Sequence, residues 1–390
     1  MRFHFIIATL VLGLGGCVFK DGGATKVSST GPEHCGLITA DEVWAADLNP
    51  HIVTCDVFLE GGTLTIGAGT EVLFESDVGL WVSEDDGRAN LDVAGTLSEP
   101  VSFRHTSGSA PGLWRGIGVH RAAGDVVLSH LTIDGGGGFN SVAALLVEHT
   151  DITVDHLTVT NSEDLGLSFR YASGLSEDST ALVVSGSDGY PVRIDPPRAD
   201  TLPAEESDYT GNAIDAIAVH PSGTDYERMD RSALWEDLGV SYVAEQGLYV
   251  DGRTGAPAIL TLEPNVHVEF TRTSGLHLSN RDGASGLVAV GTPDAPVVLT
   301  SADATDVGAW SGLFIHDNAL DSEVLLDHVE ITWGGGFNSE AAVTLTSASP
   351  TIRNTLIAGS ECWGMQMWRD SAPVMENVTF EGNECGDVAP

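Results

Sequence analysis

Lysine is almost missing from this chain. Only Lys20 and Lys26 occur in 390 residues, and 17 lysines and arginines together are set against 56 aspartates and glutamates, for a formal net charge of −39. Binding to nucleic acid through its phosphates needs a basic surface, and no stretch supplies one, so this class of function is excluded. Acidic turns that keep a secreted protein soluble account for the charge, and binding of divalent cations is the alternative.

The sequence also lacks long helix-forming stretches, a coiled-coil pattern and low-complexity tracts. Its 46 glycines, together with abundant Val, Thr and Ser, are typical of an all-β protein. Hydrophobic residues make up 42% of the chain, which is enough to build a core and argues against a disordered protein.

Two copies of one stretch show that the chain is internally duplicated. Residues 128–141 read LSHLTIDGGGGFNS and residues 326–339 read LDHVEITWGGGFNS, so that Asn140 and Asn338 correspond. Trp114 and Trp310 also correspond, and in each case a glycine follows after one intervening residue. These matches have nearly the same offset, and we infer a tandem duplication of a unit of nearly 200 residues.

A shorter period lies inside each unit. His130 is followed by His156, and Asn354 by Asn377, each at the same place in a short alternating apolar segment that ends in turn residues. Coils of 23–26 residues built from short strands predict a parallel β-helix, a solenoid of stacked coils. A leucine-rich repeat has similar length, but its signature is absent.

The repeats divide the chain. We expect a first β-helix unit over residues 35–195, an insertion with connecting coils over residues 196–256, and a second β-helix unit over residues 257–390. One continuous solenoid is our interpretation, and two separate β-helices are the alternative.

The first residues carry an export signal. Arg2 precedes an apolar run, residues 5–14, that is too short to cross a bilayer as a helix. Residues 14–17, Leu-Gly-Gly-Cys, resemble the lipobox of bacterial lipoproteins, and an ordinary secretory signal is the alternative. The resemblance implies a signal peptide over residues 1–16, a lipid on Cys17, a flexible tether over residues 17–34, and a place in the bacterial cell envelope, at the outer membrane.

Four further cysteines form two pairs that are local in sequence. Cys35 and Cys55 lie 20 residues apart, and Cys362 and Cys385 lie 23 apart, about one coil in each case. Neighbouring coils bring such pairs within disulfide reach, so we predict one disulfide at each end of the solenoid. A zinc site of four cysteines is the competing interpretation, but no C-x₂-C spacing is present.

Several sequence segments resemble those of a known group of proteins. They are TLTIGAGTEVLF at residues 63–74, the Leu-x-Val-x-Gly-Thr stretch that begins at Leu91, and Trp-x-Gly-Ile at Trp114. They resemble the secreted bacterial parallel β-helix repeat proteins of the pectin lyase-like superfamily. The resemblance implies a right-handed, single-stranded parallel β-helix. It leaves function open, because this fold is used by enzymes, adhesins and surface proteins alike.

Catalytic residues of that superfamily are not found at matching places. Pectin-degrading hydrolases of this fold carry Asn-Thr-Asp, Asp-Asp, Gly-His-Gly and Arg-Ile-Lys motifs. Here Asp85 and Asp86 lie in a turn without the other motifs, Arg193-Ile lacks the lysine because Asp195 follows, and Gly-His-Gly is absent. Lyases of this fold carry a cluster of aspartates that binds Ca²⁺, and the sequence shows no comparable cluster. We therefore predict no catalytic residues.

Histidines and tryptophans are the remaining candidates for a site. His130 and His156 should stack about 4.8 Å apart on neighbouring coils. A column of histidines could bind a metal, but without a surrounding carboxylate at ligand spacing we predict a structural ladder and no metal site. Clustered aromatic side chains suit glycans, and we predict a possible platform of Trp333, Trp363 and Trp368.

The leading hypothesis is a non-catalytic lipoprotein of the bacterial cell surface that acts as a structural, adhesive or glycan-binding module. The expected partners are a membrane, through the lipid anchor, and a polysaccharide or surface protein. A carbohydrate-active enzyme, either polysaccharide lyase or glycoside hydrolase, with a non-standard site is the alternative. A third possibility is a structural protein stabilised by Ca²⁺.

Overall fold

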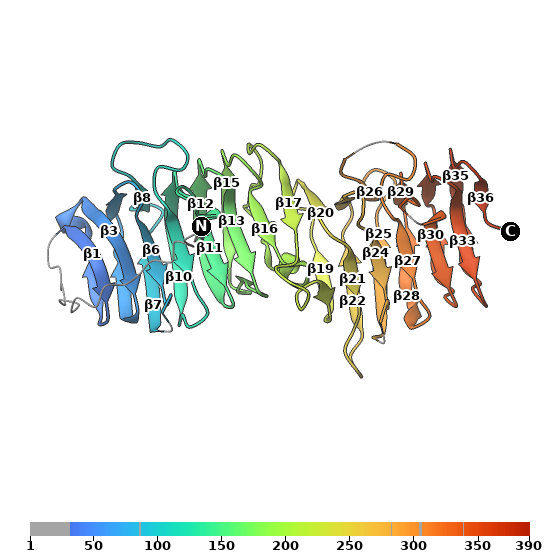
Figure 1. Ribbon diagram of the computed structural model, residues 1–390, viewed down its shortest axis with the longest axis horizontal. Coiled ribbons are helices and arrows are strands. Elements are labelled where there is room, and N and C mark those ends of the chain that lie inside the picture. The colour runs from blue at the N-terminus through green and yellow to red at the C-terminus, as the bar shows by residue number, and fades with distance from the viewer. Residues whose placement is uncertain (1–31, 86, 282, 304–305, 338) are drawn as a thin grey trace, which may run out of the picture.

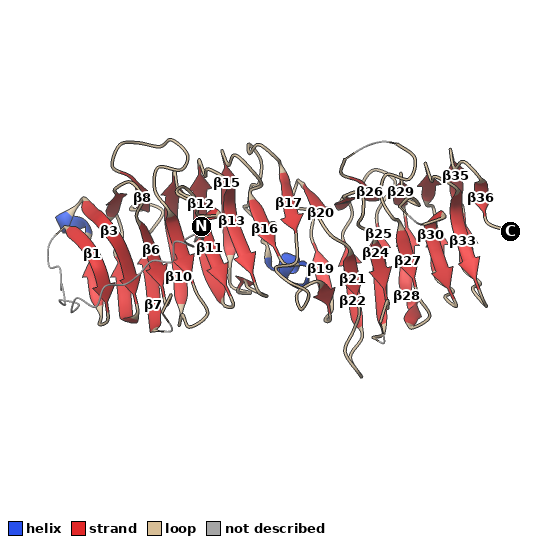
Figure 2. Ribbon diagram, in the orientation of Figure 1, coloured by secondary structure: helices blue, strands red, loops and turns tan. Residues whose placement is uncertain are grey.

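The chain winds into an elongated rod of stacked coils. The computed structural model describes residues 32–390 apart from residues 86, 282, 304–305 and 338. The rod begins at β1 and ends at β36 (Figure 1). Its strands pair in parallel, and the only helical segments in the described part are two 3-10 helices, η1 (Ala46–Leu48) and η2 (Pro196–Thr201) (Figure 2). The predicted all-β parallel β-helix is confirmed.

None of the helices in the described ranges is long and apolar enough to cross a membrane.

Each coil contributes a strand to three sides of the rod, and the chain visits the sides in a fixed order. The first side is a ladder that runs the whole length of the rod. Its strands are β1 (Glu33–Ile38), β3 (His51–Leu59), β6 (Gly79–Val82), β9 (Gly116–Val119), β11 (Ala143–Glu148), β13 (Leu165–Arg170), β16 (Val192–Ile194), β17 (Ala216–Val219), β20 (Ser241–Ala244), β23 (His267–Phe270), β26 (Val297–Ser301), β29 (Val329–Thr332), β32 (Leu356–Ala358) and β35 (Thr379–Glu381).

The second side follows the first along the chain. It comprises β2 (Glu42–Trp44), β4 (Gly61–Ile66), β7 (Arg88–Ala94), the first halves of β10 (Val126–Asp134) and β12 (Asp151–Thr160), β14 (Gly174–Leu175), β18 (Arg228–Met229), β21 (Leu248–Val250), β24 (Leu276–Leu278), β27 (Leu313–Ile315), β30 (Ala341–Thr346), β33 (Trp363–Trp368) and β36 (Gly386–Val388).

The third side completes each coil. It comprises the first half of β3, β5 (Glu71–Phe74), β8 (Val101–His105), the second halves of β10 and β12, β15 (Thr180–Ser185), β19 (Ala233–Trp235), β22 (Ala258–Leu262), β25 (Ser285–Val290), β28 (Ala319–Asp327), β31 (Thr351–Arg353) and β34 (Val374–Glu376).

Alternating sequence explains the core. In β4 and β5 every second side chain points inward, so Leu64, Ile66, Val72 and Phe74 are fully buried while their neighbours reach the surface. Trp114 is also fully buried and stacks on Phe74 at 4.0 Å between ring centroids. Trp310 and Phe270 repeat this arrangement in the second unit at 4.3 Å. The two tryptophans thus fill the inside of a coil, one in each unit.

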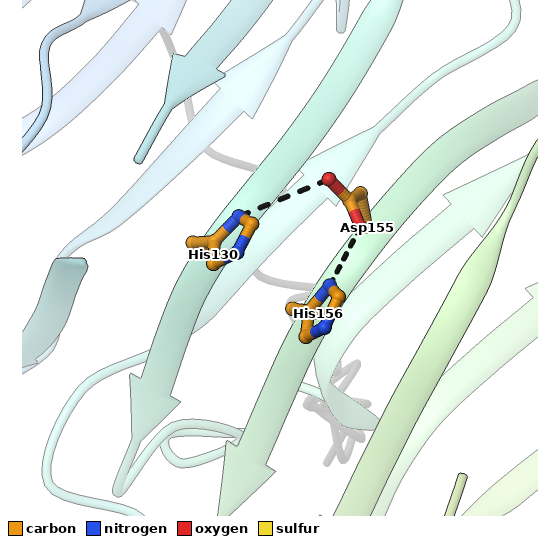
Figure 3. A group of neighbouring side chains, drawn as sticks. All are labelled: His130, Asp155 and His156. Carbon is orange, nitrogen blue, oxygen red and sulfur yellow. Dashed lines mark hydrogen bonds and ion pairs between the residues drawn. The ribbon is translucent and has the colours of Figure 1, made fainter. Parts of the chain in front are cut away.

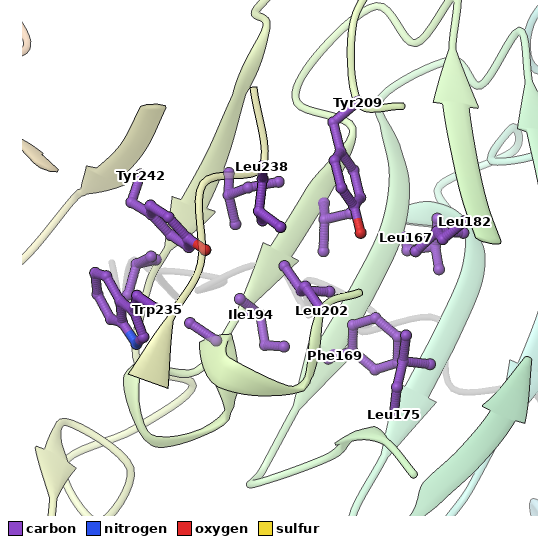
Figure 4. Close-up of a cluster of buried hydrophobic side chains, with 14 of the residues drawn as sticks. Leu167, Phe169, Leu175, Leu182, Ile194, Leu202, Tyr209, Trp235, Leu238 and Tyr242 are labelled. Atoms are coloured by element: carbon purple, nitrogen blue, oxygen red, sulfur yellow. The ribbon is translucent and has the colours of Figure 1, made fainter. Parts of the chain in front are cut away.

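The coil between the two units is irregular but does not interrupt the ladder. The first side passes directly from β16 to β17 and on to β20. On the second side η2 takes the place of a strand, and it contacts β14 before it and β18 after it. Tyr209, Trp235 and Tyr242 fill the interior there, with the leucines and isoleucine shown around them (Figure 4). Residues 196–256 thus connect the units as one solenoid.

Equivalent strands of the two units lie on different sides. β5 belongs to the third side, whereas its counterpart β23, 196 residues later, belongs to the first. Likewise β11 lies on the first side and its counterpart β30 on the second. The second unit is therefore displaced by one side of the rod relative to the first.

Both ends of the rod carry a disulfide. Cys35 is joined to Cys55 and Cys362 to Cys385. These are the pairs that the one-coil spacing predicts. Cys17, with its predicted lipid, lies outside the described residues.

Candidate functional site

A groove lies on the first side of the rod over the first unit. It consists of two adjoining hollows of about 330 and 170 Å³, which share the residues Val142 and Arg170. The side chains that define it come from β6, β13 and β16, from the turns that follow β10 and β17, and from the residue directly before β9. They are Trp81, Arg115, Phe139, Asn140, Arg170, Arg193 and His220.

Aromatic rings form one part of the groove. Trp81 points outward from β6 and lies over Gly118 of the next coil, where an added Cβ would collide with the indole ring. The indole N–H donates a hydrogen bond to Asp56 at 3.2 Å, which fixes the ring. Phe139 lines the same hollow from a left-handed turn position and is 43% exposed. The groove thus offers flat apolar surface beside polar groups.

Two clusters of the same composition hold the polar part. In each cluster an arginine and a histidine from other coils both contact one glutamate. Arg170 donates to Glu148 at 3.2 Å, and His120 Nδ1 lies 3.5 Å from the same carboxylate. The hydrogen bond from His120, followed by the charge of Arg170, lowers the pKa of Glu148 below its ordinary value, against the opposing effect of burial.

The second cluster has the same residue types farther along the groove, but here the arginine and the histidine both come from coils that precede the glutamate. Arg193 donates to Glu245 at 2.7 Å, and His220 Nδ1 lies 3.0 Å from it. The close approach of His220 and then the charge of Arg193 lower the pKa of Glu245, while burial opposes them. Both glutamates are therefore held ionised, and the arginines are fixed in place with further N–H groups left to donate.

This arrangement can bind a polar ligand with apolar faces. Exposed aromatic faces with fixed guanidinium donors beside them match the alternating C–H surfaces and hydroxyl groups of a sugar. The register of the sheet brings the groove together, because Trp81, Arg170 and Arg193 lie far apart in the sequence but on nearby coils. Sequence reasoning missed this groove.

The predicted tryptophan platform is dispersed in the structure. Trp333 lies in the turn after β29, where its ring covers Gly359, while Trp363 begins β33 and Trp368 ends it. No ring contact joins these three residues in the part of the chain that the structure describes. Trp368 is 52% exposed and is the most accessible of the three.

The predicted histidine stack is present. The rings of His130 and His156 lie parallel, with centroids 4.5 Å apart. Asp155, which sequence reasoning overlooked, lies next to both, and its carboxylate accepts a hydrogen bond from His156 Nδ1 at 2.7 Å. Asp155 directly precedes His156 in the sequence, so this neighbour was visible from the chain alone.

The acidic residues weighed as catalytic candidates have structural surroundings. Asp195 is fully buried and accepts hydrogen bonds from the backbone amides of Ala172 and Ser222. Asp85 lies in an exposed turn, where its amide donates to Glu60. Asp86 and Asn338 lie outside the described residues.

The largest hollow, about 910 Å³, lies where η2 interrupts the second side. Its two arginines are already paired, Arg198 with Asp151 at 2.7 Å and Arg231 with Asp200 through both guanidinium nitrogens and both carboxylate oxygens. Glu177, Glu205 and Glu236 also line it. The hollow has neither the aromatic surface nor the accessible donors of the groove.

Compared with protein-family models, with curated proteins and with solved structures, the chain shows no match.

Proposed function

We propose that this protein is a non-catalytic glycan-binding module of the bacterial cell envelope, which holds a polysaccharide in the groove over its first unit. The observation that carries the proposal is the placement of Trp81, Phe139 and Arg170 around one hollow. Aromatic faces supply contact area with little loss of conformational entropy, and the fixed arginines supply hydrogen bonds and select for hydroxyl or carboxylate groups.

The remainder of the molecule suits a surface module. A solenoid is a rigid spacer, and disulfides persist in oxidising compartments such as the periplasm or the cell surface. The lipobox resemblance adds a membrane anchor at Cys17. A Cys17→Ser variant should leave the membrane fraction, and unchanged fractionation would rule out the anchor.

A glycan array probed with the purified protein, followed by titration with the best ligand, tests the binding site. Trp81→Ala and Arg170→Ala should each weaken binding at least about tenfold, since each removes a central contact. Arg104→Ala is the matched control, because Arg104 pairs with Glu71 on the third side, away from the groove. Unchanged affinity in both groove variants would refute the proposed site.

Trp368→Ala separates the groove from the predicted tryptophan platform. Trp368 is more exposed than any other residue of that platform, and it lies on the second side of the second unit. If Trp368→Ala weakens binding while Trp81→Ala does not, the glycan lies on the second unit instead.

One observation favours the alternative, a carbohydrate-active enzyme. Burial raises the pKa of Glu84, whereas His120 and Arg170 lower that of Glu148, and His120 interacts with both glutamates. Opposite pKa shifts in two carboxyl groups that both interact with one histidine match the usual arrangement of a general acid and its partner. New reducing ends or unsaturated products from a bound glycan, abolished by Glu84→Gln, would establish this function in place of simple binding.

A further inference from the structure

The corner between the second and third sides carries a column of side chains in the first unit. At this corner β10 and β12 each bend at one residue with a left-handed backbone, His130 with φ 46° and His156 with φ 56°. The next two coils place Ala181 and Glu206 at the same position, again with positive φ. A left-handed residue at a corner directs its side chain away from both strands, so the column lies outside the core.

Asp155 brings a carboxylate between the two imidazoles. One of its oxygens is 2.7 Å from His156 Nδ1, and the other is 3.8 Å from His130 Nδ1 (Figure 3). The side chains of Asp155 and His156 are 42% and 45% exposed, so an ion can reach them from solvent. One donor atom from each of the three residues lies within 4.8 Å of the others.

His130 supplies a second observation. Its Nδ1 is shielded from solvent and makes no hydrogen bond to any described residue, although it faces Asp155. A buried imidazole nitrogen without a partner costs free energy, and a metal ion in front of it would restore the missing interaction.

The other end of the column provides support for a bound ion. Glu206 lies 3.7 Å from His156 Nε2, because Ala181 leaves room for it to reach across one coil. A histidine that binds a metal through one ring nitrogen almost always donates the other N–H to a carboxylate or carbonyl group. If His156 binds through Nδ1, Glu206 is placed to accept that second hydrogen bond.

We propose that His130, Asp155 and His156 form a binding site for a divalent transition-metal ion of the zinc class. Two imidazole nitrogens and one carboxylate are ligands that Zn²⁺, Cu²⁺ and Ni²⁺ prefer over Ca²⁺ and Mg²⁺. Three protein ligands leave a fourth position open to water or to a group from a partner molecule. This proposal is independent of the glycan groove, which lies on another side of the rod.

Binding requires small side-chain movements. Zn–N distances of about 2.0–2.1 Å in a tetrahedral site separate two nitrogen ligands by about 3.3 Å. The parallel rings must therefore tilt so that their Nδ1 lone pairs converge. The corner residues can do this because their side chains project from the coil and Asp155 and His156 are largely exposed.

The second unit shows the equivalent corner, which there lies between the third and first sides, without the site. His328, Asn354 and Asn377 form its column, with Asn354 and Arg353 standing where the first unit has His156 and Asp155. Asp327 accepts hydrogen bonds from Asn354 at 2.8 Å and Arg353 at 2.9 Å, which occupy its carboxylate. The duplication therefore supplies an internal comparison in which amide and guanidinium groups replace the imidazole and carboxylate.

Calorimetric titration of the metal-free full chain with Zn²⁺ tests the site. We expect one ion per chain, bound at micromolar or lower concentration and unaffected by millimolar Ca²⁺. Replacing Zn²⁺ by Co²⁺ should give a visible absorption band that reports its ligands. Absence of binding at micromolar Zn²⁺ would overturn the proposal.

Variants locate the ion. Glu206→Gln removes only an outer partner of the metal and should weaken Zn²⁺ binding about 10- to 100-fold. His156→Asn and Asp155→Asn each remove a direct ligand and should weaken Zn²⁺ binding by more than that. Asparagine already occupies the equivalent corner of the second unit at Asn354, so the His156→Asn variant should fold. His328→Asn is the control in the second unit and should leave affinity unchanged. Equal affinity in His156→Asn, or an equal loss in His328→Asn, would show that Zn²⁺ binds elsewhere.

Discussion

His277 should make the second unit sensitive to acid. It projects from β24 on the second side and is stacked between Tyr249 and Phe314 of the neighbouring coils, with ring centroids 5.0 and 4.4 Å away. Burial between these rings, with a smaller effect from nearby His316, lowers the pKa of His277 from 6.5 to about 4. The neutral imidazole is therefore the form that the folded protein accommodates.

The sign and size of the effect follow from this shift. Below about pH 6.5 the unfolded chain takes up a proton at His277 that the folded chain refuses, so stability falls with pH until about pH 4 and is then constant. The full loss is the difference in pKa times about 1.4 kcal/mol, or roughly 3 kcal/mol. About 2 kcal/mol of it has been lost at pH 5.

His277→Phe removes the titrating group and keeps the stack, since phenylalanine already occupies the next coil at Phe314. Urea unfolding of both proteins at about pH 7.5 and pH 5 gives the change in unfolding free energy with pH. The wild type should lose about 2 kcal/mol more than the variant between these values. His267→Phe changes an exposed histidine of the same unit and should respond to pH as the wild type does.

An equal loss of stability in the wild type and in His277→Phe would refute this reasoning. It would mean that the ring is protonated in the folded state, or that the coils open at this position before the chain unfolds.

Three further predictions test the framework. Replacing both Cys362 and Cys385 by alanine should destabilise the last coils by roughly 3 kcal/mol, as a 23-residue loop implies, and hydrogen exchange would show the loss confined to that end. Trp114→Ala should cost about 3–5 kcal/mol in urea unfolding because the ring is fully buried, whereas Trp81→Ala on the surface should cost far less. Asp195→Ala removes a buried carboxylate that accepts hydrogen bonds from the amides of Ala172 and Ser222, and it should lower the unfolding free energy by about 2–6 kcal/mol, part of which Asp195→Asn should restore.

The sequence allowed the fold to be predicted because its signals are local. Alternating apolar residues specify short strands, and the recurrence of His130 at His156 gives the length of a coil. Disulfide pairing followed from the same period, since residues one coil apart lie side by side. The stack of His130 on His156 required nothing more than this register.

The displacement of the two units could not be predicted in this way. Coil lengths vary in the structure, with 22 residues between the paired Leu145 and Leu167 and 37 between Leu80 and Ile117, so an offset of 196 residues does not fix whether a unit closes on a whole number of coils. The displacement arises across the junction, where η2 takes the place of a strand and Tyr209 is buried in the interior.

The groove escaped prediction for a related reason. Its residues come from separate coils and are brought together only by the sheet register, which links Trp81 to Gly118 and Ser168 to Arg193. Each arginine looks like an isolated surface charge in the sequence, and only the structure shows the glutamate and histidine beside it. By contrast, Asp155 was adjacent to a singled-out histidine, and weighing that neighbour would have revealed the cluster.

The displacement limits the length of any bound glycan. The counterparts of Trp81 and Arg170 in the second unit are His277 and Trp368, and they lie on the second side, so the groove does not continue along one face.

Along the first side the groove extends from Trp81 on β6 to His220 beyond β17, a distance of about 24 Å at about 4.8 Å per coil. Glu269 projects farther along the same side, and its charge repels an acidic chain. Affinity for an acidic polysaccharide should therefore reach its limit with an oligosaccharide about 24 Å long. A steady gain with longer chains, measured by calorimetry over a series of sizes, would show that the second unit takes part in binding.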